Sequence, residues 1–261
     1  MKKVVIALSL VVVVLGGYLV INELSKNNNI NLNESNKGNE KVYNVNDYVN
    51  INKVNSNLND IEILKVDEKE FENFKSIKDE FLLKEENKDN DSIEKDYSSE
   101  ISYQIYKNVL SVMFNGDEVY SGQEPVPYPT EDNIATSVNI NLDDNKKLSF
   151  EEVCEMFDVK VDSVLKLVLK DLADGIEFDY LLEGTEGDIS QPQVEITDFK
   201  SNIDKYKDVL KKSDYEKVIN LYIKDNKLMC TYDDSRVLAN IDLSSHMGIG
   251  LVNKYVTLEV K

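Results

Sequence analysis

An uncharged run near the N-terminus divides the chain before any other feature does. The run extends from Val4 to Ile21 and contains no charged side chain. As a helix it would be about 27 Å long, close to the ~30 Å hydrocarbon core of a bilayer. Lys2 and Lys3 precede it, and the positive-inside rule keeps such residues on the cytoplasmic side. We therefore expect residues 1–24 to be a single-pass anchor in the cell membrane, with its N-terminus cytoplasmic and the bulk of the chain outside.

A cleaved signal peptide is the alternative to this anchor. No A-x-A-like cleavage site follows the run, and Tyr18 stands where a lipoprotein would carry cysteine. Both observations favour an uncleaved anchor through residues 4–21, and the sequence leaves cleavage itself open.

The segment after the anchor, residues 25–60, is crowded with asparagine and holds few apolar residues. Such a composition buries too little apolar surface to offset the entropy lost on ordering. We expect a flexible tether, within which only 48–54 alternates like a first strand. The ectodomain is then predicted to span 61–261.

From Ile61 the chain alternates between strand patterns and helical spacing of apolar residues. Helices are predicted at 67–87, 150–157, 161–175 and 199–212, and the charged stretch 84–96 is predicted to be a solvated loop. Strands are predicted at 61–66, 100–106, 109–114, 118–122, 134–142, 218–223, 227–232, 237–243 and 255–260. Asn115-Gly116 and Asp225-Asn226 are hairpin turn signals, because these residues tolerate positive φ.

Strands in groups, with helices inserted between them, predict an α+β fold built on an antiparallel sheet and preceded by one transmembrane helix. The ectodomain can also be divided into two lobes, with 61–99 in the first and 100–261 in the second.

The net charge limits the partners of the ectodomain. The whole chain carries −19, and residues 1–24 contribute +1 through Lys2, Lys3 and Glu23, so the remainder carries −20. This charge repels nucleic acid and attracts basic proteins and cations. Neither a P-loop nor a Rossmann glycine fingerprint is present, and no cofactor is expected.

Cys154 and Cys230 are the only cysteines. In an exported chain they can form a disulfide, but sequence does not show whether they come within bridging distance. Cys154 lies on an apolar helix face and Cys230 in a strand pattern, so two buried thiols are the preferred interpretation.

The stretch Asn139–Val153 resembles the end of an EF-hand loop. Calcium would be held by Asn141, Asp143, Asn145 and Glu152. Lys146 replaces the glycine that the loop requires, and the preceding residues alternate like a strand. Ser149 and Glu152 also form a capping-box pattern, which explains the same residues without metal and is the interpretation we favour.

A family resemblance covers about 100–234. Tyr120-Ser121-Gly122 is similar to a strand-end motif of the exported DUF4163 and DUF3298 domains of unknown function. Their second motif is matched by Asp143, Lys146, Lys147, Leu148, Phe150 and Phe157. These domains occur outside the membrane in lysozyme-sensing anti-sigma factors and ahead of some peptidoglycan deacetylases. The resemblance implies an exported recognition module for a protein, such as a basic lysozyme, or for a cell-wall component.

Catalysis is not expected. His246 is the only histidine, and Ser244, Ser245 and Asp242 lie too close to it along the chain to converge as a triad. No G-x-S-x-G elbow is present. We expect a non-catalytic binding or sensing module; the alternatives are an accessory domain of cell-wall hydrolysis or deacetylation and a calcium-binding surface protein. We expect Tyr120, Gly122 and Tyr128 to contact the ligand, since tyrosine faces beside a proline-rich loop can bind sugar or peptide.

Overall fold

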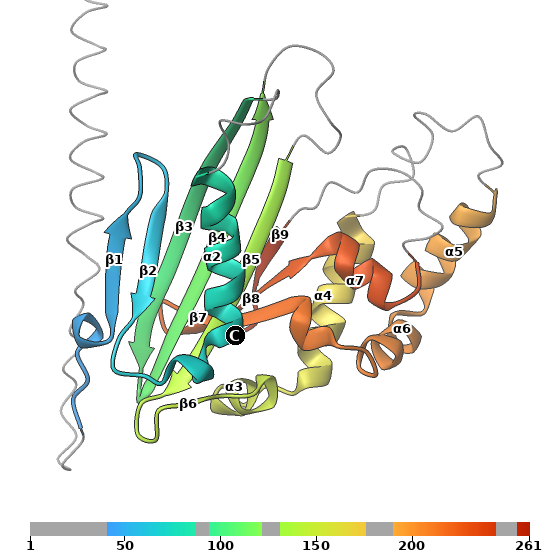
Figure 1. Cartoon of the computed structure of the whole chain (residues 1–261). Helices are drawn as coiled ribbons and strands as arrows, with labels where there is room; N and C mark the ends of the chain where they lie inside the picture. Colours follow the sequence, from blue (N-terminus) through green and yellow to red (C-terminus); the bar gives the residue numbers. More distant parts are fainter. Residues whose placement is uncertain (1–40, 87–93, 122–130, 176–189, 244–254) are drawn as a thin grey trace, which may run out of the picture. The chain divides into compact units, whose positions relative to one another are not determined.

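A larger antiparallel sheet of four strands, a smaller one of three, a separate pair of strands and the helices packed on them make up the folded part of the chain (Figure 1). The computed structural model describes residues 41–86, 94–121, 131–175, 190–243 and 255–261. The α+β class with antiparallel sheets is confirmed. Within the described residues no helix is both long and apolar enough to cross a membrane, and the predicted anchor at 4–21 lies outside them.

The larger sheet has the strand order β3 (Glu94–Tyr106), β4 (Val109–Ser121), β5 (Glu131–Asn141) and β6 (Lys146–Lys147). β4 pairs with β3 along its whole length and with β5 from Val109 to Val119. Even-numbered residues of β4, such as Leu110 and Phe114, pack beneath helix α2 (Glu72–Glu86). Odd-numbered residues, such as Met113, face the other way, towards the second sheet. β4 is therefore buried on both faces.

The hairpin turn predicted at Asn115-Gly116 is wrong, because β4 runs through both residues without a break. The turn lies instead between β3 and β4, where Lys107 has a φ of 56°. Gly116 serves a different purpose. A Cβ at this position would lie 2.7 Å from the ring of Phe81, so only glycine leaves room for that ring. The solvated loop predicted at 84–96 is shorter in the structure, since α2 continues to Glu86 and β3 begins at Glu94.

The predicted tether 25–60 overlaps the folded unit, which begins at Tyr43. Residues 43–63 form a short 3₁₀ turn (η1, Val45–Asp47) and two paired strands, β1 (Val49–Lys53) and β2 (Asn59–Ile63). The asparagines here build a turn. Asn55 Oδ1 accepts from the backbone N–H groups of residue 57 (2.9 Å) and of Leu58 (2.8 Å), and the Leu58 side chain is fully buried.

α2 buries one charged side chain together with its aromatic residues. Lys78 is 4 % exposed and donates to Asp60 on β2 (2.5 Å) and to Asp79 (2.6 Å). A short 3₁₀ turn, η2 (Glu68–Glu70), precedes the helix. Because a buried ammonium is tolerated only when paired, Lys78 joins α2 to the strand beneath it.

The smaller sheet has the order β7 (Ile219–Lys224), β8 (Lys227–Asp233) and β9 (Tyr255–Glu259). A second hydrophobic cluster joins this sheet to its helices. These are α3 (Phe150–Met156), α4 (Val161–Gly175), α5 (Ser190–Ser201), α6 (Ile203–Leu210) and α7 (Asp234–Asn240), with a 3₁₀ turn η5 (Tyr215–Lys217) before β7. The turn predicted at Asp225-Asn226 is confirmed, with φ of 53° and 62°.

Two predicted elements differ from the structure. Residues 237–243 were predicted as a strand, but 234–240 form helix α7, because the Asp233 carboxylate accepts from the Arg236 N–H (3.0 Å) and begins a helix. The helix predicted over 199–212 is broken at Asn202, whose φ of −129° and ψ of 42° are not helical. Asn202 donates to Asp198 (2.7 Å), so its side chain stabilises the break.

Both cysteines are free and buried, which confirms the preferred interpretation. Burial raises the pKa of Cys154 and of Cys230 to about 12. Each thiol therefore stays protonated at neutral pH and acts as a small apolar side chain.

The packing of Phe81 on Gly116 can be tested by substitution. Gly116→Ala should lower the free energy of unfolding by about 1–3 kcal/mol, because the added methyl group overlaps the ring. Gly175→Ala is the matched control, since a Cβ there meets nothing within 4 Å and alanine suits the end of a helix. Urea denaturation measures both. Equal stability of the two variants would show that Phe81 moves aside at no cost.

Candidate functional site

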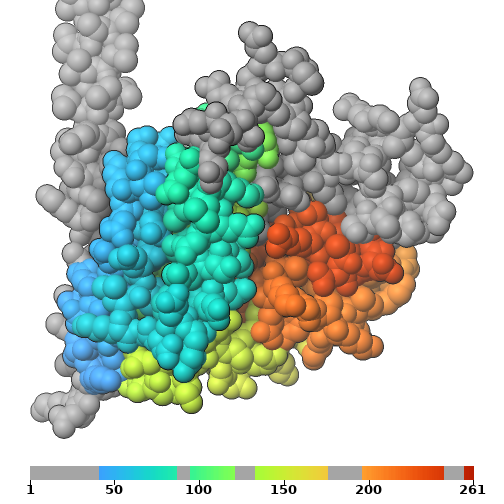
Figure 2. Space-filling model, viewed as in Figure 1, coloured from blue at the N-terminus to red at the C-terminus, as the bar shows by residue number. Residues whose placement is uncertain are grey.

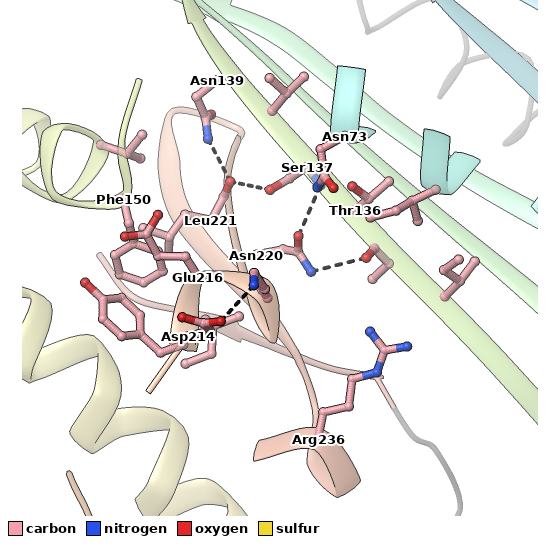
Figure 3. A pocket seen from close by; sticks show the side chains of 18 of the residues that line it. Asn73, Thr136, Ser137, Asn139, Phe150, Asp214, Glu216, Asn220, Leu221 and Arg236 are labelled. Atoms are coloured by element: carbon pink, nitrogen blue, oxygen red, sulfur yellow. Dashed lines mark hydrogen bonds and ion pairs between the residues drawn. The ribbon is translucent and has the colours of Figure 1, made fainter. Parts of the chain in front are cut away.

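A groove of about 810 Å³ lies along the outer edge of β5 (Figure 3). Its floor is formed by residues 133–139 of β5. One wall comes from α2, the other from η5, the start of β7 and Arg236 of α7. Lys147, Leu148, Ser149 and Phe150 close one end. In Figure 2 the surface of α2 borders the orange surface of the α6–β7 region, the two sides between which the groove lies.

The outer edge of β5 is only briefly paired. β6 pairs with Ile140 and Asn141, and the Leu148 N–H then donates to the Asn139 carbonyl (2.8 Å). From Glu131 to Asn139 no strand of the described chain pairs with this edge. An unpaired edge of this length exposes backbone donors and acceptors that another chain can use.

The side-chain amide of Asn220 occupies part of the edge (Figure 3). Its Oδ1 accepts from the Ser137 N–H (3.2 Å), and its Nδ2 donates to the Ala135 carbonyl (3.3 Å). A residue of a parallel strand makes the same two bonds to the residues on either side of its partner. The amide therefore makes the bonds that the N–H and the C=O of one residue of an added strand would make.

Next to Asn220, the Leu221 carbonyl accepts from Ser137 Oγ and from Asn139 Nδ2, each at 2.8 Å. Asn139 is only 6 % exposed, and its Oδ1 has no hydrogen-bond partner among the described residues. A buried acceptor without a donor is unfavourable. The end of the groove near β6 thus holds an unused hydrogen-bond acceptor.

The lining is rich in neutral polar groups. Nine of its residues carry an amide or a hydroxyl: Asn73, Asn133, Thr136, Ser137, Asn139, Ser149, Ser213, Tyr215 and Asn220. Tyr215 packs edge-on against Phe150 and donates to Glu151 (2.7 Å). Burial, together with this hydrogen bond, raises the pKa of Tyr215, so the hydroxyl stays neutral at physiological pH. Such a surface suits an uncharged polymer backbone.

Of the predicted ligand residues, the structure describes only Tyr120, and it lies away from the groove. Tyr120 is at the end of β4, where the Lys95 ammonium lies 5.4 Å from its ring centroid, and it does not line the groove. Lys95 also lies 3.2 Å from the buried Glu118, which accepts from the Tyr97 hydroxyl. Burial, and then the Glu118 carboxylate, raises the pKa of Tyr97 to about 12. Gly122 and Tyr128 lie outside the described residues, as does His246.

The predicted capping box is confirmed. The Ser149 N–H donates to Glu152 Oε2 (2.8 Å), and the Glu152 N–H donates to Ser149 Oγ (3.2 Å). Asn141 ends β5, and Asn145, with a φ of 55°, lies in the turn that leads to β6. The Asp143 carboxylate accepts from the Asn108 amide (2.7 Å). Within the described residues no three acidic, cysteine or histidine side chains are arranged to hold a metal ion.

The groove was missed by sequence reasoning because its residues come from 73 to 236. A local signal existed in β5, where Asn133, Ser137 and Asn139 alternate with apolar residues. The pattern predicts a strand, but it does not predict that Asn139, at 6 % exposed, and Thr136, at 2 % exposed, are almost completely buried.

Comparison with known proteins adds no assignment: no protein-family model and no curated protein matches this chain. The similarity to DUF4163 and DUF3298 domains therefore stays an expectation from the motifs alone.

The capping box predicts a stability effect. Ser149→Ala should lower the free energy of unfolding by about 1 kcal/mol, because the Glu152 N–H loses its acceptor. Glu152→Gln should cost less, since glutamine also fits the N3 position of a capping box. Thermal unfolding followed by circular dichroism compares the two. A larger loss for Glu152→Gln would show that the carboxylate has another role.

The same variant separates the cap from a calcium site. Glutamine cannot supply the bidentate carboxylate of an EF-hand loop. We expect titration calorimetry to show no micromolar calcium affinity in the wild-type chain or in Glu152→Gln. Micromolar affinity in the wild type that vanishes in the variant would establish a calcium site.

Proposed function

We propose that this chain is a non-catalytic binding or sensing module, anchored by residues 4–21 in the cell membrane, that takes a protein or cell-wall ligand on the outer side. The observation that carries the proposal is the groove along β5, whose floor and walls offer amides, hydroxyls and free strand-edge groups. Strand-edge groups of this kind can bind the backbone of an extended peptide.

The lining supports binding rather than turnover. A general acid or base works best when its pKa lies near the operating pH. Two lining residues have a clearly shifted pKa: the hydrogen bond to Asp214 raises that of Lys217, and burial raises that of Tyr215, so both keep their protons. The Tyr215 hydroxyl is already engaged by Glu151. The groove is therefore better suited to holding a ligand than to moving its protons.

The net charge of the chain also contributes to the proposed binding. At −19 overall, the protein attracts basic partners over long range, which raises association rates at low salt. The groove itself mixes four cationic and three acidic residues with nine neutral polar ones. Charge thus accounts for the encounter, and hydrogen bonding in the groove accounts for recognition.

Blocking the groove tests the proposal. Asn73 lies on the α2 wall and is exposed, so Asn73→Trp should fill the groove and weaken binding about ten-fold or more, the loss of one or two hydrogen bonds. Ser76→Trp is the matched control, on the same helix, exposed and outside the lining. Titration calorimetry on the full chain would use soluble peptidoglycan fragments and a basic lysozyme as probes.

Equal binding of a probe by both tryptophan variants would place recognition outside the groove. Release of new products from the wall fragments by the wild-type chain would favour the alternative role in cell-wall hydrolysis or deacetylation.

A further inference from the structure

We infer that the ligand of the groove is an extended peptide with basic side chains, which adds as a strand to the outer edge of β5. The inference rests on the proposed function and specifies the class of its ligand. It depends on three features: the unpaired edge, the amide of Asn220 and the unpaired charges on the walls.

The outer edge of β5 already binds an amide group. The Asn220 amide bonds to the Ser137 N–H and the Ala135 carbonyl, so these two backbone groups point away from β4, along the plane of the sheet, and can be reached by a planar amide. At 3.2 and 3.3 Å the two bonds are at or just beyond the long end of the usual range. One side-chain amide is easier to displace than a paired strand, because only two bonds must be exchanged.

The chain also shows where an added strand would start. β6 runs antiparallel to β5 for two residues, and the chain then leaves the sheet at the capped start of α3. A peptide antiparallel to β5 would continue the line of β6 over residues 139 to 131. It would meet Asn139 first, whose carbonyl already accepts from the Leu148 N–H and whose side-chain Oδ1 is buried. Strand addition would exchange the two bonds of the Asn220 amide for backbone bonds to the same edge.

The wall charges select basic side chains. Three of the four groove cations are engaged by carboxylates: Lys84 by Glu118, Lys217 by Asp214 and Arg236 by Asp233. Glu80 on α2 and Glu216 on η5 are both exposed, and neither forms an ion pair within the described residues. Of the four lining cations, only Lys147 has no ion pair with a carboxylate of the described residues. Successive side chains of a strand point to opposite faces, so lysines or arginines of the peptide can reach either wall.

The first test uses a fluorescent ten-residue peptide of alternating lysine and threonine as the probe, with the full-length wild-type chain. N-methylation of its four central residues removes the donors on both edges, and we expect about ten-fold weaker binding by anisotropy. Hydrogen exchange at the Ser137 amide should slow when the unmodified peptide is added. Equal affinity of the two peptides, or unchanged exchange at Ser137, would overturn strand addition.

The second test addresses the charge. Glu80→Gln should weaken the peptide about three-fold at low salt, the size expected of an exposed ion pair. Glu72→Gln, on the same helix but outside the groove, is the matched control and should have no effect. Equal affinity of both variants for the peptide would show that Glu80 does not select basic side chains.

Failure of strand addition can be distinguished from failure of the proposed binding function. If no peptide binds, but Asn73→Trp still blocks the wall fragments or the lysozyme, strand addition is wrong and the groove keeps its binding role. If Asn73→Trp blocks none of these probes, both proposals are wrong.

Discussion

The burial of β4 on both faces is the constraint on which the described fold depends. Its even-numbered residues lie under α2, and its odd-numbered residues face the smaller sheet. Ser111 on this second face accepts from the Ile223 N–H (2.8 Å), so one hydroxyl of β4 fixes the position of β7. Because a strand buried on both faces tolerates neither a turn nor a shift of register, β3, β5, α2 and β7 all take their places from it.

The sequence predicted the parts of the fold that depend on local patterns. Amphipathic spacing located α2 and α4, the Asp225-Asn226 pair located a tight turn, and Ser149 with Glu152 located the start of α3. It failed where a distant contact decides the conformation. Asn115-Gly116 has the composition of a turn, yet Gly116 is in a strand because the Phe81 ring, 35 positions away, lies on it.

The candidate site was harder to predict than the fold. Tyrosine and proline attract attention as contact residues, but Tyr120 packs beside Lys95 at the end of a strand. The groove depends on an edge left open by the shortness of β6 and on the approach of Asn220 from a sheet that follows much later in the chain. No local pattern encodes the meeting of two such segments. Only the buried polar residues of β5 gave a hint.

The outer edge of β5 is protected in a way that still permits binding. Natural proteins usually protect an edge strand with charges, proline or a covering element, which makes the edge unusable. Here a neutral amide from β7 satisfies one N–H and one carbonyl of β5 and leaves the neighbouring positions lined by a polar groove. Such an amide hinders random strand pairing, since a partner must replace its two bonds. A partner that also engages the walls gains enough further contacts to do so, and protection and recognition can then depend on the same residue.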